Sequence, residues 1–167
     1  RANEAICREA ANHPDLIVRC ASQWAYYPGM VKMIEWARKR PFGRLMEVRA
    51  GILHSSDMDL KKPINWKRMI AYNGEYGCMG DLAPHVHFVP LRLGWFPHTV
   101  MGELWNIAEE RPDSTGTPVP CETWDNAVVR GKAREVQSDK EFSLVFETKR
   151  MSPGNTNTFF FEIIGTE

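Results

Sequence analysis

Residues 74–85, Gly-Glu-Tyr-Gly-Cys-Met-Gly-Asp-Leu-Ala-Pro-His, form the most informative stretch of this chain. Three glycines within seven positions predict a loop that can take backbone angles closed to other residues. Asp81 follows the loop as a favoured helix N-cap, and His85 comes four residues later. Because positions i and i+4 share one face of a helix, the carboxylate and imidazole should point together into the space that the loop frames. The stretch therefore predicts one edge of an active site.

Helices are predicted on both sides of this loop. An alanine-rich segment favours a helix over residues 2–12, and Pro28 opens a second helix that the basic residues 38–40 close. A third helix should run from Asp81 to about Leu93, since Gly94 is placed as its stop.

Pro90 lies inside this third predicted helix. Proline cannot donate to the carbonyl of the residue four positions earlier, so it should kink the helix.

Most of the remaining chain is typical of strands joined by short connections. Apolar runs and alternating patterns predict strands at 16–21, 45–53, 99–108, 126–134, 142–149 and 158–164. Residues 55–80 should be irregular apart from a short helix near 66–70, and residues 111–120 should form a loop. Consecutive strands without intervening helices favour antiparallel pairing. The predicted fold class is α+β, a mostly antiparallel open sheet with helices on one face.

The composition excludes several classes of partner. The 167 residues contain 21 Lys and Arg against 21 Asp and Glu, so the chain lacks the positive charge that attracts nucleic acid or an acidic membrane. No apolar run approaches membrane-spanning length. The four cysteines are isolated from one another, which favours free thiols in a reducing compartment over a disulfide framework. We therefore expect a cytoplasmic protein.

The order of these features resembles the Gfo/Idh/MocA oxidoreductases, the glucose-fructose oxidoreductase and inositol dehydrogenase group. The resemblance begins with the strand and aromatic-proline segment at 16–28 and continues through Arg40-Pro-Phe-Gly-Arg-Leu and Asn65-Trp-Lys-Arg. It then includes the glycine loop with Asp81-x-x-x-His85, Leu93-Gly94, and Ile163-Ile-Gly-Thr. Nearly the whole chain matches in order, which is more persuasive than any single motif.

The resemblance implies a division of the chain into two parts. Residues 1–27 would be the remnant of an α/β dinucleotide-binding domain, and residues 28–167 a truncated substrate and dimerisation domain. The family's glycine-rich phosphate loop and its Glu-Lys-Pro segment, whose lysine takes part in catalysis, do not occur in this sequence. These 167 residues alone should therefore bind NAD or NADP poorly and should not turn substrate over.

Within this resemblance the chemistry falls to His85 and Asp81. The reaction would transfer hydride between the nicotinamide and a carbon that bears a hydroxyl group, and a histidine suits the accompanying proton transfer. Asp81 would hold a substrate hydroxyl or orient the imidazole. The alternative is an N-cap aspartate and a histidine without chemistry. The family often has an aspartate three residues after this histidine, where this chain has Phe88.

Several aromatic and polar residues are weaker site candidates. Tyr26, Trp66, Lys67 and Tyr76 could bind a sugar or polyol by stacking and hydrogen bonding, and Tyr27 could contact the cofactor. Plain packing roles remain open for these aromatic residues.

A metal site is the third reading of the histidines. His87 could join His85 with Asp81 or His54, but residues two apart on a helix point in different directions. We therefore predict no metal site.

Two functions follow as expectations. The first is the substrate domain of a nicotinamide-dependent oxidoreductase acting on a sugar, polyol or related hydroxy compound. The alternative is a non-catalytic relative that serves as a dimerisation or small-molecule-binding module. Homo-oligomerisation through the sheet is expected, because Phe159-Phe-Phe places apolar side chains on both faces of the last strand.

Overall fold

The protein is built around one twisted sheet with a helical layer on one face. The computed structural model describes residues 2–19, 22–136 and 138–167. The sheet has the strand order β2-β5-β6-β1-β7. Its strands are β1 (Leu45–Leu53), β2 (Pro97–Trp105), β5 (Asn126–Arg134), β6 (Glu141–Lys149) and β7 (Thr158–Gly165). All neighbouring pairs are antiparallel except β1 and β6, so the predicted α+β class and the mostly antiparallel sheet are confirmed.

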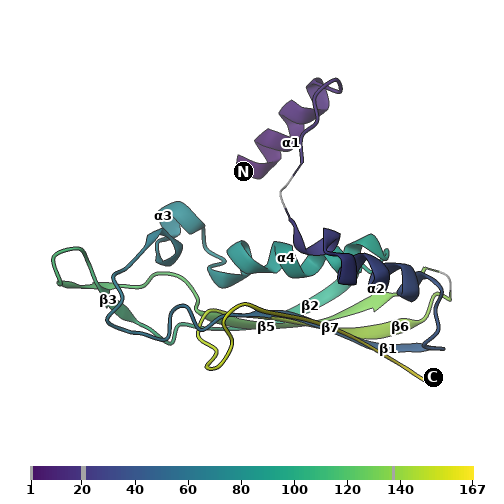
Figure 1. Ribbon diagram of the computed structural model, residues 1–167. Coiled ribbons are helices and arrows are strands. Elements are labelled where there is room, and N and C mark those ends of the chain that lie inside the picture. The colour runs from purple at the N-terminus through teal and green to yellow at the C-terminus, as the bar shows by residue number, and fades with distance from the viewer. Residues whose placement is uncertain (1, 20–21, 137) are drawn as a thin grey trace.

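The helical layer covers a single face of this sheet (Figure 1). It consists of η1 (Trp24–Tyr26), α2 (Pro28–Arg38) and α4 (Cys78–Arg92), with α4 packed on β1, β5 and β6. The short η2 (Trp66–Arg68) and α3 (Ile70–Asn73) precede α4, while α1 (Ala2–Asn12) lies apart from the layer and is almost entirely exposed. No helix in the described ranges has both the length and the apolar character needed to cross a membrane.

The core lies between α4 and the inner face of the sheet. On α4 the buried side chains recur every three or four residues, at Cys78, Leu82, Val86 and Val89. On β1 they alternate, at Val48, Ala50 and Ile52. Burying each large aliphatic side chain contributes about 1.5–3 kcal/mol relative to exposure. These two periodicities determine which face of α4 packs on the sheet, and they leave its other residues outside the core.

The parallel pair of strands decides where the site forms. β1 and β6 run side by side in the same direction, with Leu53 opposite Lys149 at their carboxyl ends. The chain therefore leaves both strands at one edge of the sheet, at His54 and Arg150. A backbone hydrogen bond of 2.7 Å from the His54 N–H to the Lys149 carbonyl joins these ends.

The chain segment before η1 corrects one prediction. Residues 16–19 form no strand, and the side chains of Leu16, Ile17 and Val18 are exposed. The apolar run has no hydrogen-bonded neighbour strand among the described residues, and an isolated strand is not stable. Cys20 and Ala21, the end of the predicted strand, lie outside the described residues. The division at residue 27 stays a prediction.

Two further differences concern the region after α4. The strand predicted at 99–108 is observed as Pro97–Trp105. The predicted loop at 111–120 contains a short hairpin, formed by β3 (Glu110–Pro112) and β4 (Pro118–Pro120). The prolines at their ends obscured this pairing, because proline lacks the N–H that a strand donates.

Candidate active site

The glycine loop brings the start of α4 against the neighbouring chain. Gly77 has φ +51°, and a Cβ at this position would lie 2.5 Å from the Trp124 backbone nitrogen. Only glycine fits such an approach. Gly74 also has a positive φ, +72°, whereas Gly80 lies within the helix and needs no special conformation.

The helix starts earlier than the sequence indicates. α4 begins at Cys78, after Gly77 as N-cap, so the prediction of Asp81 as the N-cap is wrong. The close approach of Gly77 to Trp124 allows the Cys78 N–H to donate to the Trp124 carbonyl at 3.1 Å, which satisfies a donor that a cap side chain would otherwise bind. Asp81 lies in the first helical turn instead, where a carboxylate is stabilised by the helix dipole.

Hydrogen bonds from side chains to the backbone hold η2 beside this helix. The Asn73 amide donates to the carbonyls of Lys67, at 2.9 Å, and Gly77, at 3.1 Å. The Thr123 hydroxyl donates to the same Lys67 carbonyl at 2.7 Å. The backbone at Lys67 is therefore tied to both the glycine loop and the loop before β5.

A cavity of about 270 Å³ opens between α4 and the carboxyl ends of β1 and β6. Asp81 and His85 both line it, as their i, i+4 spacing predicts, and Lys67 lies beside them. Its functional side chains are Trp24, His54, Lys67, Asp81, His85 and Arg150. Proton-transfer, cationic and carboxylate groups thus converge from η1, η2, α4 and two strand ends.

Asp81 lies between two cations. Arg150 Nη2 forms an ion pair with Asp81 Oδ2, and Lys67 Nζ lies 3.8 Å from the same oxygen. The Arg150 side chain is 3% exposed, against 20% for Asp81 and 33% for Lys67. The arginine therefore forms the floor of the cavity, and the lysine stands closer to its mouth.

The two cavity histidines favour the neutral state. Burial lowers the pKa of His85, and burial together with the positive charges of Arg150 and Lys67 lowers the pKa of His54. Nδ1 of His85 is buried and has no hydrogen-bond partner in the protein. A neutral imidazole in the wall of a cavity can accept a proton from a bound hydroxyl group.

A second charged cluster lies next to the residues that line the cavity. Arg68, fully buried, pairs with Asp57 at 2.5 Å and with Asp125. Burial alone would raise the pKa of Asp57, but Arg68 and Lys62 outweigh it and the pKa is lowered. Asp125 also accepts from the backbone N–H groups of 107 and 108, at 2.6 and 2.7 Å. We call Asp57, Lys62, Arg68 and Asp125 the buried cluster.

The aromatic candidates lie outside the cavity lining. Tyr26, Trp66 and Tyr76 are at least half exposed, and the Tyr26 ring stacks under the Arg92 guanidinium at 4.9 Å. Tyr27 contacts Trp24, with ring centroids 5.2 Å apart. Their proposed binding roles stay predictions.

Three lining residues were not predicted as part of this site, although His54 was considered as a metal ligand. Trp24 stacks on Phe159 with centroids 5.4 Å apart, and His54 and Arg150 follow the ends of β1 and β6. A polar residue directly after a strand was the available signal for the last two. It could not be used, because nothing local shows that strands nearly a hundred residues apart run parallel.

His87 and Cys78 belong to the core rather than to the cavity. The His87 ring packs on Phe146 with centroids 4.6 Å apart, away from His85. Cys78 is buried, and burial raises the pKa of its thiol. Across the described ranges, no group of three or more His, Cys, Asp or Glu side chains is arranged to hold a metal ion.

Comparison by sequence and by structure gives different results. No family model and no curated protein matches this sequence. An NAD binding oxidoreductase from Klebsiella pneumoniae has a similar structure, with a TM-score of 0.81, 20% identity, and 96% of this chain covered. An oxidoreductase domain protein from Kribbella flavida gives a TM-score of 0.75, with 25% identity over 86% of the chain.

A levoglucosan dehydrogenase in complex with NADH is similar as well, with a TM-score of 0.72 and 25% identity over 87% of this chain. The chain spans 41%, 36% and 37% of the length of these three structures, about two fifths of each. The resemblance found in the sequence is therefore confirmed at the level of fold. All three of these structures are oxidoreductases or dehydrogenases by name, one described as NAD binding and one in complex with NADH.

Proposed function

We propose that this chain is the substrate domain of a nicotinamide-dependent oxidoreductase that acts on a sugar, polyol or related hydroxy compound. The observation that carries the proposal is the joint placement of His85 and Asp81 in one cavity. The similarity in fold to NAD-binding oxidoreductases supports it, and so does the sugar dehydrogenase among them.

The chain's own residues would bind the substrate and move a proton. The neutral His85 accepts the hydroxyl proton on its imidazole ring as the carbon loses hydride. Asp81, held by Arg150 and Lys67, accepts a hydrogen bond from a second hydroxyl and fixes the substrate's orientation. Closely placed groups of this kind raise the rate by positioning as well as by proton transfer.

NAD or NADP is the expected cofactor, and it supplies or accepts the hydride. The cavity offers a candidate contact for only one end of this cofactor, the nicotinamide ring. Trp24 is an aromatic side chain of its lining and would hold the nicotinamide ring, in preference to the predicted Tyr27, which lies behind it. The chain carries no Gly-x-Gly-x-x-Gly loop for the pyrophosphate.

The test is turnover by the full-length protein, followed through the absorbance of the reduced cofactor. His85→Ala should lower kcat by about 10²–10⁴-fold, the usual contribution of a general base, while cofactor affinity stays unchanged. His98→Ala is the matched control, because His98 pairs with Glu141 at 3.3 Å on the sheet, far from the cavity lining.

Full activity in the His85→Ala variant would remove the histidine from the mechanism. Tight binding of a polyol without any change in cofactor absorbance, with every candidate substrate, would favour the alternative of a non-catalytic binding module.

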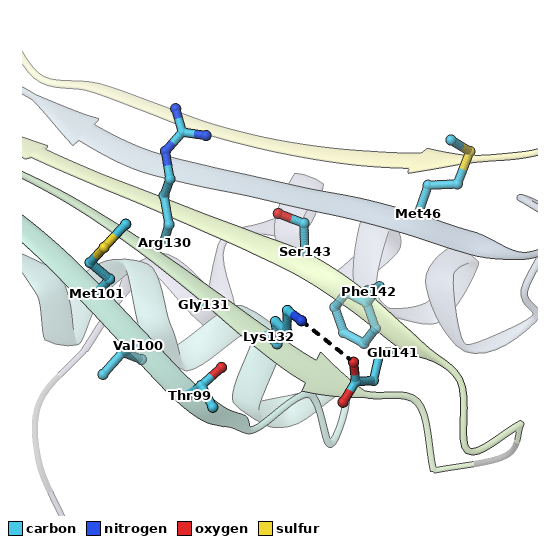
Figure 2. A pocket seen from close by; sticks show the side chains of 10 residues that line it. All are labelled: Met46, Thr99, Val100, Met101, Arg130, Gly131, Lys132, Glu141, Phe142 and Ser143. Atoms are coloured by element: carbon cyan, nitrogen blue, oxygen red, sulfur yellow. Dashed lines mark ion pairs between the residues drawn. The ribbon is translucent and has the colours of Figure 1, made fainter.

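We also propose that the uncovered face of the sheet packs against a second copy of the chain. A hollow of about 500 Å³ lies on this face. Its lining includes Met46, Met101 and the Lys132–Glu141 ion pair (Figure 2). Met101 is 67% exposed and Met46 53%. A sheet face that exposes apolar side chains at both ends of such a hollow is a candidate interaction surface.

Met101→Glu should convert the oligomer into a monomer in light scattering coupled to gel filtration. The control is Met58→Glu, since Met58 is also exposed but lies in the loop after β1. A wild-type protein that is monomeric at high concentration would contradict the proposed packing.

A further inference from the structure

The charges that line the cavity do not balance. Lys67 and Arg150 face a single carboxylate, that of Asp81, and the two histidines favour the neutral state. One positive charge is therefore left over in a cavity whose floor is almost fully buried.

The neighbouring buried cluster does not supply the missing negative charge. Asp57 is bound by Lys62, at 3.2 Å, and by Arg68, which also binds Asp125. Two cations thus meet two carboxylates within that cluster, and it is neutral as a unit. The buried cluster therefore does not compensate the excess positive charge of the cavity.

The cavity also holds cationic donors without acceptors. The Arg150 side chain is 3% exposed, and its buried Nε donates to no protein atom. Lys67 Nζ can donate three hydrogen bonds, yet it lies 3.8 Å from Asp81 Oδ2 and 5.5 Å from the centre of the Trp66 ring. Because Lys67 is one third exposed, its free donors can bind a ligand oxygen in the cavity, and the buried charge of Arg150 strengthens the attraction for an anion.

We propose that the substrate carries a carboxylate, as a sugar acid or another polyhydroxy acid does. Its carboxylate lies beside Lys67 Nζ, on the side away from Asp81 and within the field of Arg150, and the hydroxyl that reacts faces His85. This inference rests on the proposed function and narrows its substrate class. A carboxylate matches one excess positive charge, whereas a phosphate monoester with nearly two negative charges would exceed it.

The choice between acid and neutral substrates can be tested with ligands of equal size. D-gluconate and D-glucitol differ only in a carboxylate that replaces a hydroxymethyl group. Titration calorimetry of the full-length protein, with cofactor present and ionic strength fixed, should give a 10- to 100-fold lower Kd for gluconate, the range of a charge-assisted hydrogen bond.

The gluconate preference should depend on the two cations. Lys67→Met should reduce the ratio of the two affinities by about tenfold, and Arg150→Gln should do the same. Lys67 is one third exposed, so its variant is expected to fold even where Arg150→Gln is unstable. Lys132→Met is the matched control, because Lys132 also faces a carboxylate, at 3.9 Å, but on the open face of the sheet.

The outcomes distinguish the carboxylate proposal from the proposed oxidoreductase function. A gluconate Kd no lower than that of glucitol, including the absence of binding by both, overturns the carboxylate proposal. Tighter binding of D-glucose 6-phosphate than of gluconate overturns it too. Turnover of neutral polyols without any preference for acids would contradict this inference and leave the proposed oxidoreductase intact. Selective gluconate binding without cofactor reduction by any substrate would support the carboxylate inference and contradict the proposed oxidoreductase.

Discussion

Lys67 and Arg68 are neighbours in sequence but serve two very different charged clusters. Arg68 turns into the interior, where it is fully buried between Asp57 and Asp125. Lys67 turns to the cavity, where it is one third exposed and lies 3.8 Å from Asp81. The 3₁₀ turn η2 sends consecutive side chains in different directions, so one short element serves both the fold and the site.

The two clusters differ in the balance of their charges. In the buried cluster the cations and carboxylates balance, and the neighbouring backbone supplies further donors to Asp125. In the group formed by Lys67, Asp81 and Arg150, one cation is in excess. A buried cluster with balanced charges offers no net charge to a ligand, whereas a cavity with an excess cation is where an anionic ligand can gain free energy.

The largest expected effect is the loss of the buried cluster. Arg68→Met should lower the free energy of unfolding by about 3–5 kcal/mol, because it leaves buried carboxylates without their partner. Urea unfolding measures this change. The control is Arg49→Met, since Arg49 is 41% exposed and its carboxylate partners lie on the open face. That variant should cost about 0–1 kcal/mol. Equal losses in the two variants would erase the distinction between the clusters.

A smaller loss of stability is expected at the floor of the cavity. Arg150→Met should cost about 1–3 kcal/mol, the range for leaving one polar group unsatisfied. Asp81 keeps Lys67 nearby and is 20% exposed, so water can solvate it. The same unfolding experiment measures this variant. A loss as large as that of Arg68→Met would show that the cavity group is as structural as the buried cluster.

Acid should affect the cavity before it affects the buried cluster. The pKa of His85 is lowered by burial, so the imidazole becomes protonated only below its ordinary value of 6.5. Turnover requires the neutral form, and kcat/KM should therefore fall about tenfold per pH unit on the acid side of that lowered pKa. The pH profile of kcat/KM in the oxidising direction measures it.

The buried cluster should respond at lower pH. The pKa of Asp57 is lowered from 3.8, so its contribution to stability is present above that value and is lost as the pH falls through the folded-state pKa.

His54→Gln serves as the control for the acid limb of the kcat/KM profile that we assign to His85, because His54 shares the cavity and its pKa is also lowered. Disappearance of the limb in that variant would move the proton acceptor from His85 to His54.

The smallest effect on stability is expected at the mouth of the cavity. Lys67→Met should change the free energy of unfolding by about 0–1 kcal/mol, because an exposed ion pair contributes little. Chemical denaturation beside Arg68→Met would compare two adjacent residues directly. A loss above that of Arg150→Met would place Lys67 among the structural residues.

The sequence predicted much of the fold because the relevant signals are local. Alternation at residues 45–53, and Pro28 with the basic residues 38–40 at the two ends of α2, predicted these two elements nearly as observed. The spacing of Asp81 and His85 placed both in one cavity, since a helix fixes the angle between its own residues. The apolar residues on both faces of β7 are likewise observed, with Phe159 and Phe161 in the core and Phe160 over Gly51 on the open face.

The errors come from interactions between distant segments. The start of α4 at Cys78 depends on Gly77 meeting the backbone of Trp124, and the failed strand at 16–19 depends on a partner that is absent among the described residues. His54 and Arg150 became neighbours only because β1 and β6 pair in parallel. None of these contacts leaves a periodic trace in the sequence.

Local sequence signals account for most of the helices and strands, the glycine loop, and the shared helical face of Asp81 and His85. These properties follow from backbone sterics and helical period, which act over a few residues. Only the tertiary structure decided what those two residues face. The parallel strand pair brings Arg150 and His54 to the same edge, and burial there lowers the histidine pKa values and leaves cationic donors without partners. Desolvation and pairing depend on the whole fold, because they are set by the groups that surround a charge in space.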